Sequence, residues 1–229
     1  MERLKNILIN LGIFETARGL AGRIRAMFDR SCFLAALPYE QRRLFVETHD
    51  PVRYGAIALA LERVKNEGIE GCIAEVGVWR GYTSRIIRVM EAERRMYLFD
   101  TFEGFFEKDL EGGEDGRFRD TNVEIVKKAI GKMENVTIVP GYFPDSAQGL
   151  EDATFAFVMI DVDLFNPTLA GLNFFYERMN SGGYIFIHDY NSPESDWAVL
   201  RATNEFMKGK PEKIVEIPDM GGSVIIRKI

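Results

Sequence analysis

Acidic side chains and one histidine follow two apolar runs of this sequence. Asp161 and Asp163 come after one run, and His188 and Asp189 come after the next. If both runs are neighbouring strands of a parallel sheet, their C-terminal ends open onto one crevice, where ligands bind in such sheets. We therefore expect Asp161 and Asp189 to lie close together.

The three carboxylates predicted to cluster here need a positive charge or a proton nearby. Clustered carboxylates repel one another unless a cation neutralises them or one of them keeps its proton. An acid after a strand is often only a turn cap, but three acids beside one of the chain's two histidines are harder to explain that way. Because oxygen ligands suit hard divalent ions, we predict a metal site, with Mg²⁺ as the expected ion, on Asp161, Asp189 and His188.

A glycine-rich turn follows an earlier apolar run, in the segment Glu-Val-Gly-Val-Trp-Arg-Gly-Tyr-Thr. Glycines allow close approach of a ligand to the backbone, and the next helix is expected to open near the end of this turn. The spacing is not the Gly-x-Gly-x-x-Gly of dinucleotide sites. S-adenosylmethionine carries an ammonium and a sulfonium group and no phosphate, so a carboxylate suits it. We predict that it contacts Glu75, Gly77, Gly81, Tyr82 and Thr83.

Two further turns complete the predicted donor site. Asp100 closes a strand-like run and is placed to accept both ribose hydroxyls of a nucleoside, although a turn cap would also explain it. Thr101 and Phe102 follow it, and Gly141 and Phe143 form a turn with aromatic side chains suited to an adenine edge. We predict that these five residues bind the nucleoside.

The two predicted sites together indicate methyl transfer to a hydroxyl group. An alcohol is a poor nucleophile while it is protonated, and coordination to a divalent cation lowers the pKa of a bound hydroxyl. A nearby base must take the proton, and Asp163 and His188 are the candidates. We place Asp161 in both sites, as a metal ligand and as a contact of the methyl donor.

The elements that must position these residues form an alternating pattern. Short apolar runs of strand length alternate with segments of helical period, which indicates a parallel sheet covered by helices on both faces. The predicted strands are residues 72–78, 96–99, 136–139, 155–160 and 184–187. The predicted helices are residues 53–66, 83–93, 122–132, 168–179 and 197–208.

The chain ends in a predicted antiparallel hairpin, with strands 213–217 and 223–227 joined by a short turn. The expected fold is therefore α/β: a Rossmann-like class I methyltransferase fold with a seven-stranded, mostly parallel sheet and a C-terminal antiparallel hairpin. Its domain is expected over residues 51–229, preceded by a helical cap over residues 1–50. The segment 102–121 is either a lid or a solvated loop.

Composition excludes several classes of protein. The 229 residues are 46% hydrophobic and 28% charged, with a net charge of −6 spread along the chain. No basic face suited to nucleic acid is present in this pattern, and the N-terminal apolar run is too short to span a bilayer. Cys32 and Cys72 form no disulfide framework, so we expect a cytoplasmic protein with reduced thiols.

The motifs at residues 75–83, 99–104, 160–168 and 182–190 resemble those of the macrocin O-methyltransferase (TylF-like) family. The resemblance covers residues 45–229. It implies a metal-dependent enzyme that methylates a hydroxyl of a sugar or of another small polyhydroxylated molecule, such as a natural-product glycoside. It also implies a homo-oligomer to which the N-terminal helices contribute.

One position departs from the family pattern. The resemblance implies that Asp161 and Asp189 are metal ligands and that Asp163 is the general base. The family usually has Asp-Asp-Tyr at the second strand end, whereas this chain has His188 before Asp189 and Tyr190. Histidine is a poor ligand for Mg²⁺, so a softer ion, or a base without a metal, stays open.

Two alternatives compete with a methyltransferase. The first is an NAD-dependent or nucleotide-sugar oxidoreductase on a similar fold, against which the missing Gly-x-Gly-x-x-Gly and the missing Tyr-x-x-x-Lys pair argue. The second is a non-catalytic module that binds S-adenosylmethionine, and His188 is the one feature that favours it. Binding of NADH, or donor binding without methyl transfer, would distinguish these cases.

Overall fold

The computed structural model describes residues 44–45, 50–110, 113, 115–194 and 196–229. The predicted helical cap over residues 1–50 lies outside the described residues, apart from Leu44, Phe45 and Asp50. In the described part of the chain, no helix is long and apolar enough to cross a membrane.

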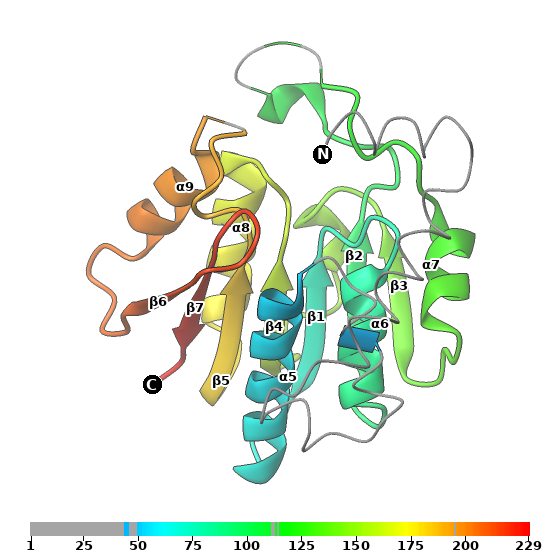
Figure 1. Ribbon diagram of the computed structural model, residues 1–229, viewed down its shortest axis with the longest axis vertical. Coiled ribbons are helices and arrows are strands. Elements are labelled where there is room, and N and C mark those ends of the chain that lie inside the picture. Colours follow the sequence, from blue (N-terminus) through cyan, green and yellow to red (C-terminus); the bar gives the residue numbers. More distant parts are fainter. Residues whose placement is uncertain (1–43, 46–49, 111–112, 114, 195) are drawn as a thin grey trace.

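A seven-stranded sheet forms the centre of the molecule (Figure 1). Its strands are β1 (Cys72–Val76), β2 (Met96–Asp100), β3 (Val136–Pro140), β4 (Phe155–Ile160), β5 (Met179–Ile187), β6 (Ile214–Ile217) and β7 (Ser223–Arg227). Their order is β3-β2-β1-β4-β5-β7-β6. The first five strands are parallel, and β7 pairs antiparallel with both β5 and β6. The predicted Rossmann-like sheet with a C-terminal hairpin is confirmed.

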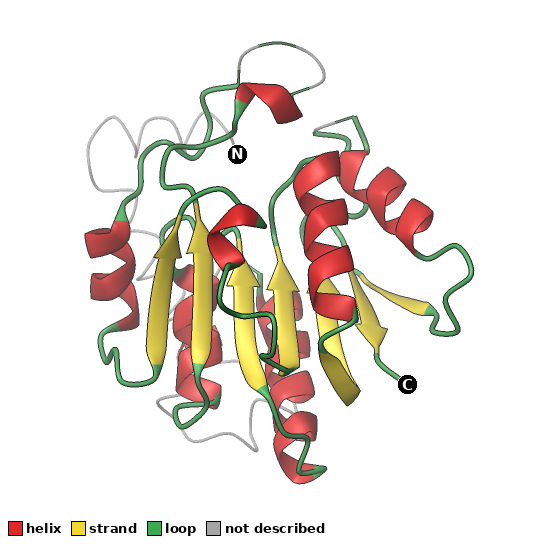
Figure 2. Ribbon diagram, turned by 180° about the vertical axis from the view of Figure 1, so that it is seen from behind, coloured by secondary structure: helices red, strands yellow, loops and turns green. Residues whose placement is uncertain are grey.

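Helices cover both faces of the sheet (Figure 2). They are α5 (Pro51–Asn66), α6 (Tyr82–Met90), α7 (Val123–Ile130), α8 (Phe165–Tyr176) and α9 (Ala198–Phe206). α5, α6 and α7 lie on one face, while α8 and α9 lie on the other. Because the first five strands are parallel, their C-terminal ends lie at the same edge of the sheet, beneath the segment that follows β2.

Strand β2 shows how the sequence builds two cores. Successive side chains of a strand point to opposite faces of the sheet. Met96 and Leu98 enter the hydrophobic cluster beneath α5 and α6, whereas Tyr97 and Phe99 enter the cluster beneath α8 and α9. Because both faces are covered, the strand has no alternation of polar and apolar residues before Asp100, which is the pattern the sequence displays.

The boundary between α8 and β5 differs from its prediction. The helix was expected to run to residue 179, but it ends at Tyr176, and Met179 already pairs with Phe155 of β4. β5 thus begins five residues before the expected start at Tyr184 and passes through Gly182 and Gly183. The glycine pair conceals the strand in the sequence, because glycine is uncommon inside strands.

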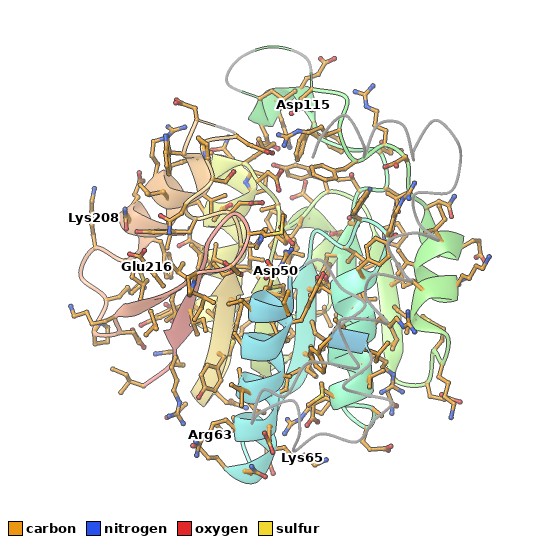
Figure 3. All side chains as sticks on the ribbon, in the orientation of Figure 1. Asp50, Arg63, Lys65, Asp115, Lys208 and Glu216 are labelled. Atoms are coloured by element: carbon orange, nitrogen blue, oxygen red, sulfur yellow. The ribbon has the colours of Figure 1, made fainter. Side chains whose placement is uncertain are left out.

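Helix α5 starts at the edge of the sheet that carries the strand ends. Asp50 caps it by accepting a hydrogen bond from the backbone N–H of Arg53, and Pro51 occupies the first turn, where its missing N–H costs nothing. Asp50 Oδ2 also accepts from the N–H of Met220 at 2.9 Å, which ties α5 to the β6–β7 turn. Figure 3 shows Asp50 at this end of α5, with Arg63 and Lys65 at the far end.

Candidate functional site

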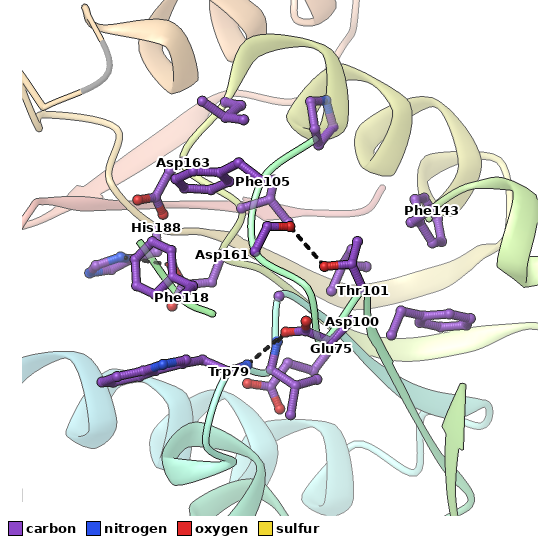
Figure 4. Close-up of a pocket in the computed structure, with 18 of the residues that line it drawn as sticks. Glu75, Trp79, Asp100, Thr101, Phe105, Phe118, Phe143, Asp161, Asp163 and His188 are labelled. Atoms are coloured by element: carbon purple, nitrogen blue, oxygen red, sulfur yellow. Dashed lines mark hydrogen bonds and ion pairs between the residues drawn. The ribbon is translucent and has the colours of Figure 1, made fainter. Parts of the chain in front are cut away.

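A cavity of about 360 Å³ lies at the C-terminal ends of β1 to β5. Asp163 and His188 lie at one end of it and Phe143 lies at the other, with Asp100 between them (Figure 4). Four residues of the segment after β2 line the cavity: Phe105, Phe106, Asp109 and Phe118. We call this segment, residues 102–121, the covering segment. The segment predicted as a lid or a solvated loop is therefore part of the wall.

The acids after β4 and β5 meet around the ring of His188. Its Nδ1 lies 3.1 Å from Oδ1 of Asp161 and 3.0 Å from Oδ2 of Asp189. Its Nε2 lies 2.7 Å from the carbonyl oxygen of Met220, which can only accept a hydrogen bond, so Nε2 carries a proton. Potential ligand atoms of all three residues lie within 4.8 Å of one another, as the sequence predicts for Asp161 and Asp189.

Opposite charges hold this cluster together. Burial alone would lower the pKa of His188, but the Asp161 carboxylate and hydrogen bonds with Asp161 and Asp189 raise it to about 11. Burial alone would raise the pKa of Asp161, but the His188 ring and the Arg53 guanidinium hold it below its usual value. Asp161 is therefore ionised at neutral pH, and Nδ1 of His188 is a place where a proton or a metal ion can sit between two carboxylates.

Asp163 lies beside the cluster in a strained backbone conformation. Its φ is 59°, in the left-handed region that costs a non-glycine residue free energy and that recurs at functional sites. Burial and the neighbouring carboxylates of Asp189 and Asp161 raise the pKa of Asp163 well above its ordinary value, although Arg117 opposes the change. Arg117 reaches it from the covering segment, with Nη1 3.4 Å from Oδ2 of Asp163.

The carboxylate of Asp100 is largely occupied by the backbone. Its Oδ2 accepts hydrogen bonds from the N–H groups of Val78 and Trp79 at 2.8 and 2.7 Å, and its Oδ1 accepts from the N–H of Phe102 at 2.7 Å. A carboxylate has about four acceptor positions. Asp100 lines the cavity with room for one further donor, which leaves it short of the two ribose hydroxyls expected from the sequence.

The glycines of the turn after β1 have packing roles that the sequence did not predict. Gly77 has φ 84°, and a Cβ there would collide with the carbonyl oxygen of Asp161, so this glycine allows the turns after β1 and β4 to pack together. Gly81 has φ 76°, precedes the first residue of α6 and faces Val126 of α7. Helix α6 thus begins at Tyr82 and not at Thr83.

Glu75 is buried inside β1 and bonded to another side chain. It accepts a hydrogen bond from the hydroxyl of Ser84 on α6. Burial raises the pKa of Glu75 to about 8, against the lowering effect of Ser84. Glu75 lines the cavity. Because its carboxyl group is mostly protonated at neutral pH, it does not balance the charge of a cationic ligand. Other acids that line the cavity would have to do so.

Most of the residues predicted from the sequence share this cavity. The predicted residues that line it are Glu75, Gly77, Tyr82, Thr83, Asp100, Thr101, Gly141, Phe143, Asp161, Asp163, His188 and Asp189. Gly81 and Phe102 do not line it: Gly81 lies between α6 and α7, and the Phe102 ring packs against the core cluster beneath α5 and α6.

Sequence reasoning missed the contribution of α5. Arg53 Nη1 lies 3.2 Å from Oδ2 of Asp161, and its side chain lines the cavity together with that of Tyr54. The Nε of Arg53 is buried without a hydrogen-bond partner among the described residues, although it forms an ion pair with Asp50 at 3.5 Å. The cap at Asp50 and Pro51 predicts the start of this helix, but no local pattern indicates a contact 108 positions further along the chain.

Sequence reasoning also missed an aromatic wall beside the acidic cluster, formed by Trp79, Phe105 and Phe118. The rings of Trp79 and Phe118 lie 5.8 Å apart edge to face, and those of Phe105 and Phe118 lie 5.3 Å apart. The Trp79 indole donates to Asp120 at 2.9 Å. All three rings line the cavity near the acidic cluster. The spacing of aromatic residues in a loop carries no period that would reveal this wall.

Solved structures with a similar fold include O-methyltransferases. The structure of the O-methyltransferase NovP superimposes with a TM-score of 0.62 and 23% identity, over 77% of this chain and 79% of that one. The calicheamicin methyltransferase CalS11 gives a TM-score of 0.63 and 18% identity, over 93% of this chain and 91% of that one. These likenesses establish the class I methyltransferase fold.

Curated relatives are also methyltransferases. An 8-demethyl-8-(2,3-dimethoxy-alpha-L-rhamnosyl)-tetracenomycin-C 4'-O-methyltransferase of Streptomyces olivaceus is 27% identical over 156 residues, or 60% of each chain. A mycinamicin III 3''-O-methyltransferase of Micromonospora griseorubida is 25% identical over 183 residues, or 70% of each chain. The alignment thus spans only 60% of the length of the tetracenomycin relative.

The sequence model of the family described as macrocin O-methyltransferase (TylF) matches residues 52–221. That match extends from the first turn of α5 to the β6–β7 turn, and so it includes the C-terminal ends of β1 to β5 that line the cavity. The chain belongs to the macrocin O-methyltransferase (TylF) family.

Proposed function

We propose that the protein transfers the methyl group of S-adenosylmethionine to a hydroxyl of a sugar unit in a small glycoside. The observation that carries the proposal is one continuous cavity, with an aromatic end at β2 and β3 and an acidic cluster at β4 and β5. Donor and acceptor bound at these two ends would meet above β1 and β4, where positioning of the two reactants provides much of the rate.

The charges of the cavity support a cationic donor. Asp100, Asp161 and Asp189 line it, and a sulfonium and an ammonium group would be attracted to them. The pyrophosphate of a dinucleotide would be repelled by the same carboxylates. This electrostatic argument and the absence of Gly-x-Gly-x-x-Gly favour S-adenosylmethionine over NAD.

Arg53 supplies a place for the carboxylate of the donor's methionine part. Arg53 lines the cavity, and a guanidinium can form charge-assisted hydrogen bonds with a carboxylate of the ligand. Thr83 lines the cavity close by, since its hydroxyl shares a hydrogen bond with Tyr54, the neighbour of Arg53 on α5. We propose that Arg53 and Thr83 bind this carboxylate.

The acidic cluster fits a divalent metal ion. Asp161, Asp189 and Nδ1 of His188 would hold it, and the hydrogen bond from His188 Nε2 to Met220 would fix the ring, as backbone carbonyls commonly do for metal-bound histidines. A bound ion lowers the pKa of a coordinated hydroxyl and orients it. Because one of the three donor atoms is nitrogen, we propose that an ion such as Mn²⁺ binds better than Mg²⁺.

Asp163 is our candidate for the general base. Burial and the neighbouring carboxylates raise its pKa, which makes its carboxylate a stronger base toward the proton of a hydroxyl. It lies on the cavity wall within reach of the acidic cluster. His188 is the second candidate, but its ring nitrogens are both engaged, with carboxylates and with the Met220 carbonyl.

The acceptor class comes from the relatives. Two of them are named for methylating a rhamnosyl-tetracenomycin and mycinamicin III, and the aromatic wall of Trp79, Phe105 and Phe118 offers flat apolar surfaces to a sugar ring. We propose a sugar hydroxyl of a neutral glycoside as the acceptor. The helical cap, the homo-oligomer and the cytoplasmic location stay predictions from the sequence.

The test is transfer of a labelled methyl group. The protein is incubated with S-[¹³C-methyl]-adenosylmethionine, Mn²⁺ and a panel of rhamnosides and other deoxysugar glycosides, and the products are analysed by mass spectrometry. We expect a product heavier by one labelled methyl group, formed about 10²- to 10⁴-fold more slowly with Asp163→Asn. Label found only on carboxylates, amines or thiols would contradict an O-methyltransferase.

A further inference from the structure

Asp109 is a buried carboxylate that the proposed chemistry leaves without a task. It is the last residue of the short 3₁₀ turn η1 (Glu107–Asp109), inside the segment that covers the cavity. Its side chain is 5% exposed and lines the cavity wall. A buried charged group needs partners, so the surroundings of Asp109 indicate what it can bind.

Two protein groups hold Asp109 and leave it acceptor capacity. Nδ2 of Asn166, in the first turn of α8, donates to Oδ1 of Asp109 at 3.3 Å. The hydroxyl of Tyr142, in the turn after β3, also hydrogen-bonds to it. A carboxylate accepts about four hydrogen bonds, so about two positions on Asp109 are open to a ligand.

The location of Asp109 points to the nucleobase. From β4 and β5 toward β3, the cavity runs from the acidic cluster past Asp100 to Phe143. A donor whose sulfur faces the acidic cluster and whose ribose reaches Asp100 would place its base at the β3 end. There Phe106, Tyr142 and Phe143 line the cavity, and the first two rings lie 5.1 Å apart. Aromatic and apolar groups of this kind suit the faces of a purine.

We propose that Asp109 accepts a hydrogen bond from the exocyclic amine of the donor's adenine. The inference rests on the proposed function and adds the residue that recognises the base. Asp109 selects an amino group at position 6 of the purine, because the carbonyl oxygen of hypoxanthine would face a carboxylate without a proton between them.

The experiment compares two ligands that differ at this position. S-adenosylhomocysteine and S-inosylhomocysteine are titrated calorimetrically into the wild-type protein, Asp109→Asn and a control, Asp145→Asn. Asp145 stands in the turn after β3, is exposed and does not line the cavity. The control therefore removes a nearby negative charge without touching the proposed contact.

We expect the wild-type protein and the control to bind S-inosylhomocysteine about 10- to 100-fold more weakly than S-adenosylhomocysteine, the range for a hydrogen bond to a charged group. In Asp109→Asn the preference should fall to about threefold or less or reverse, because an amide can donate to the carbonyl of hypoxanthine. Equal affinity of the wild-type protein for both ligands overturns the proposal, and so does an unchanged preference in a folded Asp109→Asn.

Failure of the proposed function gives a different result, namely no binding of S-adenosylhomocysteine by the wild-type protein. If Asp109→Asn does not fold, the wild-type protein is titrated with the homocysteine analogue whose purine has no substituent at position 6. That analogue lacks the amine without adding a carbonyl. An affinity equal to that of S-adenosylhomocysteine overturns the proposal, and a loss of about tenfold or more supports it.

Discussion

Arg53 of α5 donates from Nη1 to Oδ2 of Asp161, at 3.2 Å, and thereby joins the first turn of α5 to the end of β4. The Arg53 side chain is 15% exposed and Asp161 is a predicted contact of both metal and methyl donor. The ion pair places a guanidinium at the cavity wall with its Nε still free of a hydrogen bond among the described residues. Several consequences of this arrangement can be measured.

Replacement of Arg53 should weaken donor binding through the methionine carboxylate. We expect Arg53→Met to lower the affinity for S-adenosylhomocysteine by about 10- to 100-fold, the cost of losing a charged hydrogen bond. The affinity for 5'-methylthioadenosine, which has no carboxylate, should change by about threefold or less. Arg63→Met, at the exposed far end of α5, is the control. Equal losses for both ligands would mean that Arg53 acts through the fold.

Replacement of Asp163 should remove catalysis and leave donor binding intact. Asp163→Asn keeps the shape of the side chain but cannot accept the proton of the acceptor hydroxyl, and we expect kcat to fall by about 10²- to 10⁴-fold. Calorimetry with S-adenosylhomocysteine should give an unchanged affinity. Asp152→Asn, at an exposed position, is the matched control. A kcat within a factor of about three of the wild-type value would exclude Asp163 as the base.

The nitrogen donor of His188 should determine which metal ion supports activity. After removal of metal with EDTA, we expect turnover to fall and Mn²⁺ to restore it better than Mg²⁺, because imidazole suits transition metals and carboxylates suit Mg²⁺. His188→Asp restores an all-carboxylate cluster at this place and should shift the preference toward Mg²⁺. Initial rates over a series of Mn²⁺ and Mg²⁺ concentrations measure the metal preference of the wild-type protein and of His188→Asp. Full activity in EDTA, in a protein shown by elemental analysis to hold no metal, would contradict the metal site.

The buried carboxyl of Glu75 should make stability depend on pH. Burial raises its pKa from the ordinary 4.5 to about 8, so between these values the folded protein holds a proton that the unfolded chain has released. The free energy of unfolding should therefore fall as pH rises from about 4.5 to 8, by up to about 4 kcal/mol.

Glu75→Gln, which can still accept from Ser84, should lack this dependence, whereas the control Glu62→Gln, at an exposed position of α5, should keep it. Urea unfolding at several pH values measures the difference. Parallel curves for wild type and Glu75→Gln would show that the carboxyl loses its proton in the folded state at its ordinary pKa.

The strand ends could be predicted from the sequence because their chemistry is local. An apolar run followed by an acid, as at Asp100 and Asp161, fixes both the strand and the edge at which it ends. The same reasoning predicted that His188 and Asp189 lie beside Asp161 at this edge of the sheet. It also assumed that these two strands, which are consecutive in the chain, are neighbours in a parallel sheet. The parallel pairing of β4 with β5 confirms that assumption.

Contacts across the sequence could not be predicted in this way. The pairing of Arg53 with Asp161 depends on how α5 packs on the sheet, and the aromatic wall of Trp79 and Phe118 depends on the path of a long loop. Gly77 has a second role that the sequence did not reveal. It lines the cavity, as predicted for a donor contact, and its missing Cβ also leaves room for the carbonyl oxygen of Asp161.

The central claim is that the cavity binds S-adenosylmethionine, and calorimetric titration of the wild-type protein with S-adenosylhomocysteine, with and without Mn²⁺ and with NADH as the control ligand, tests it most directly. We predict binding of S-adenosylhomocysteine in the micromolar range in both conditions and no heat of binding with NADH. Binding of NADH, with no binding of S-adenosylhomocysteine, would contradict the assignment of the cavity and the proposed methyl transfer together.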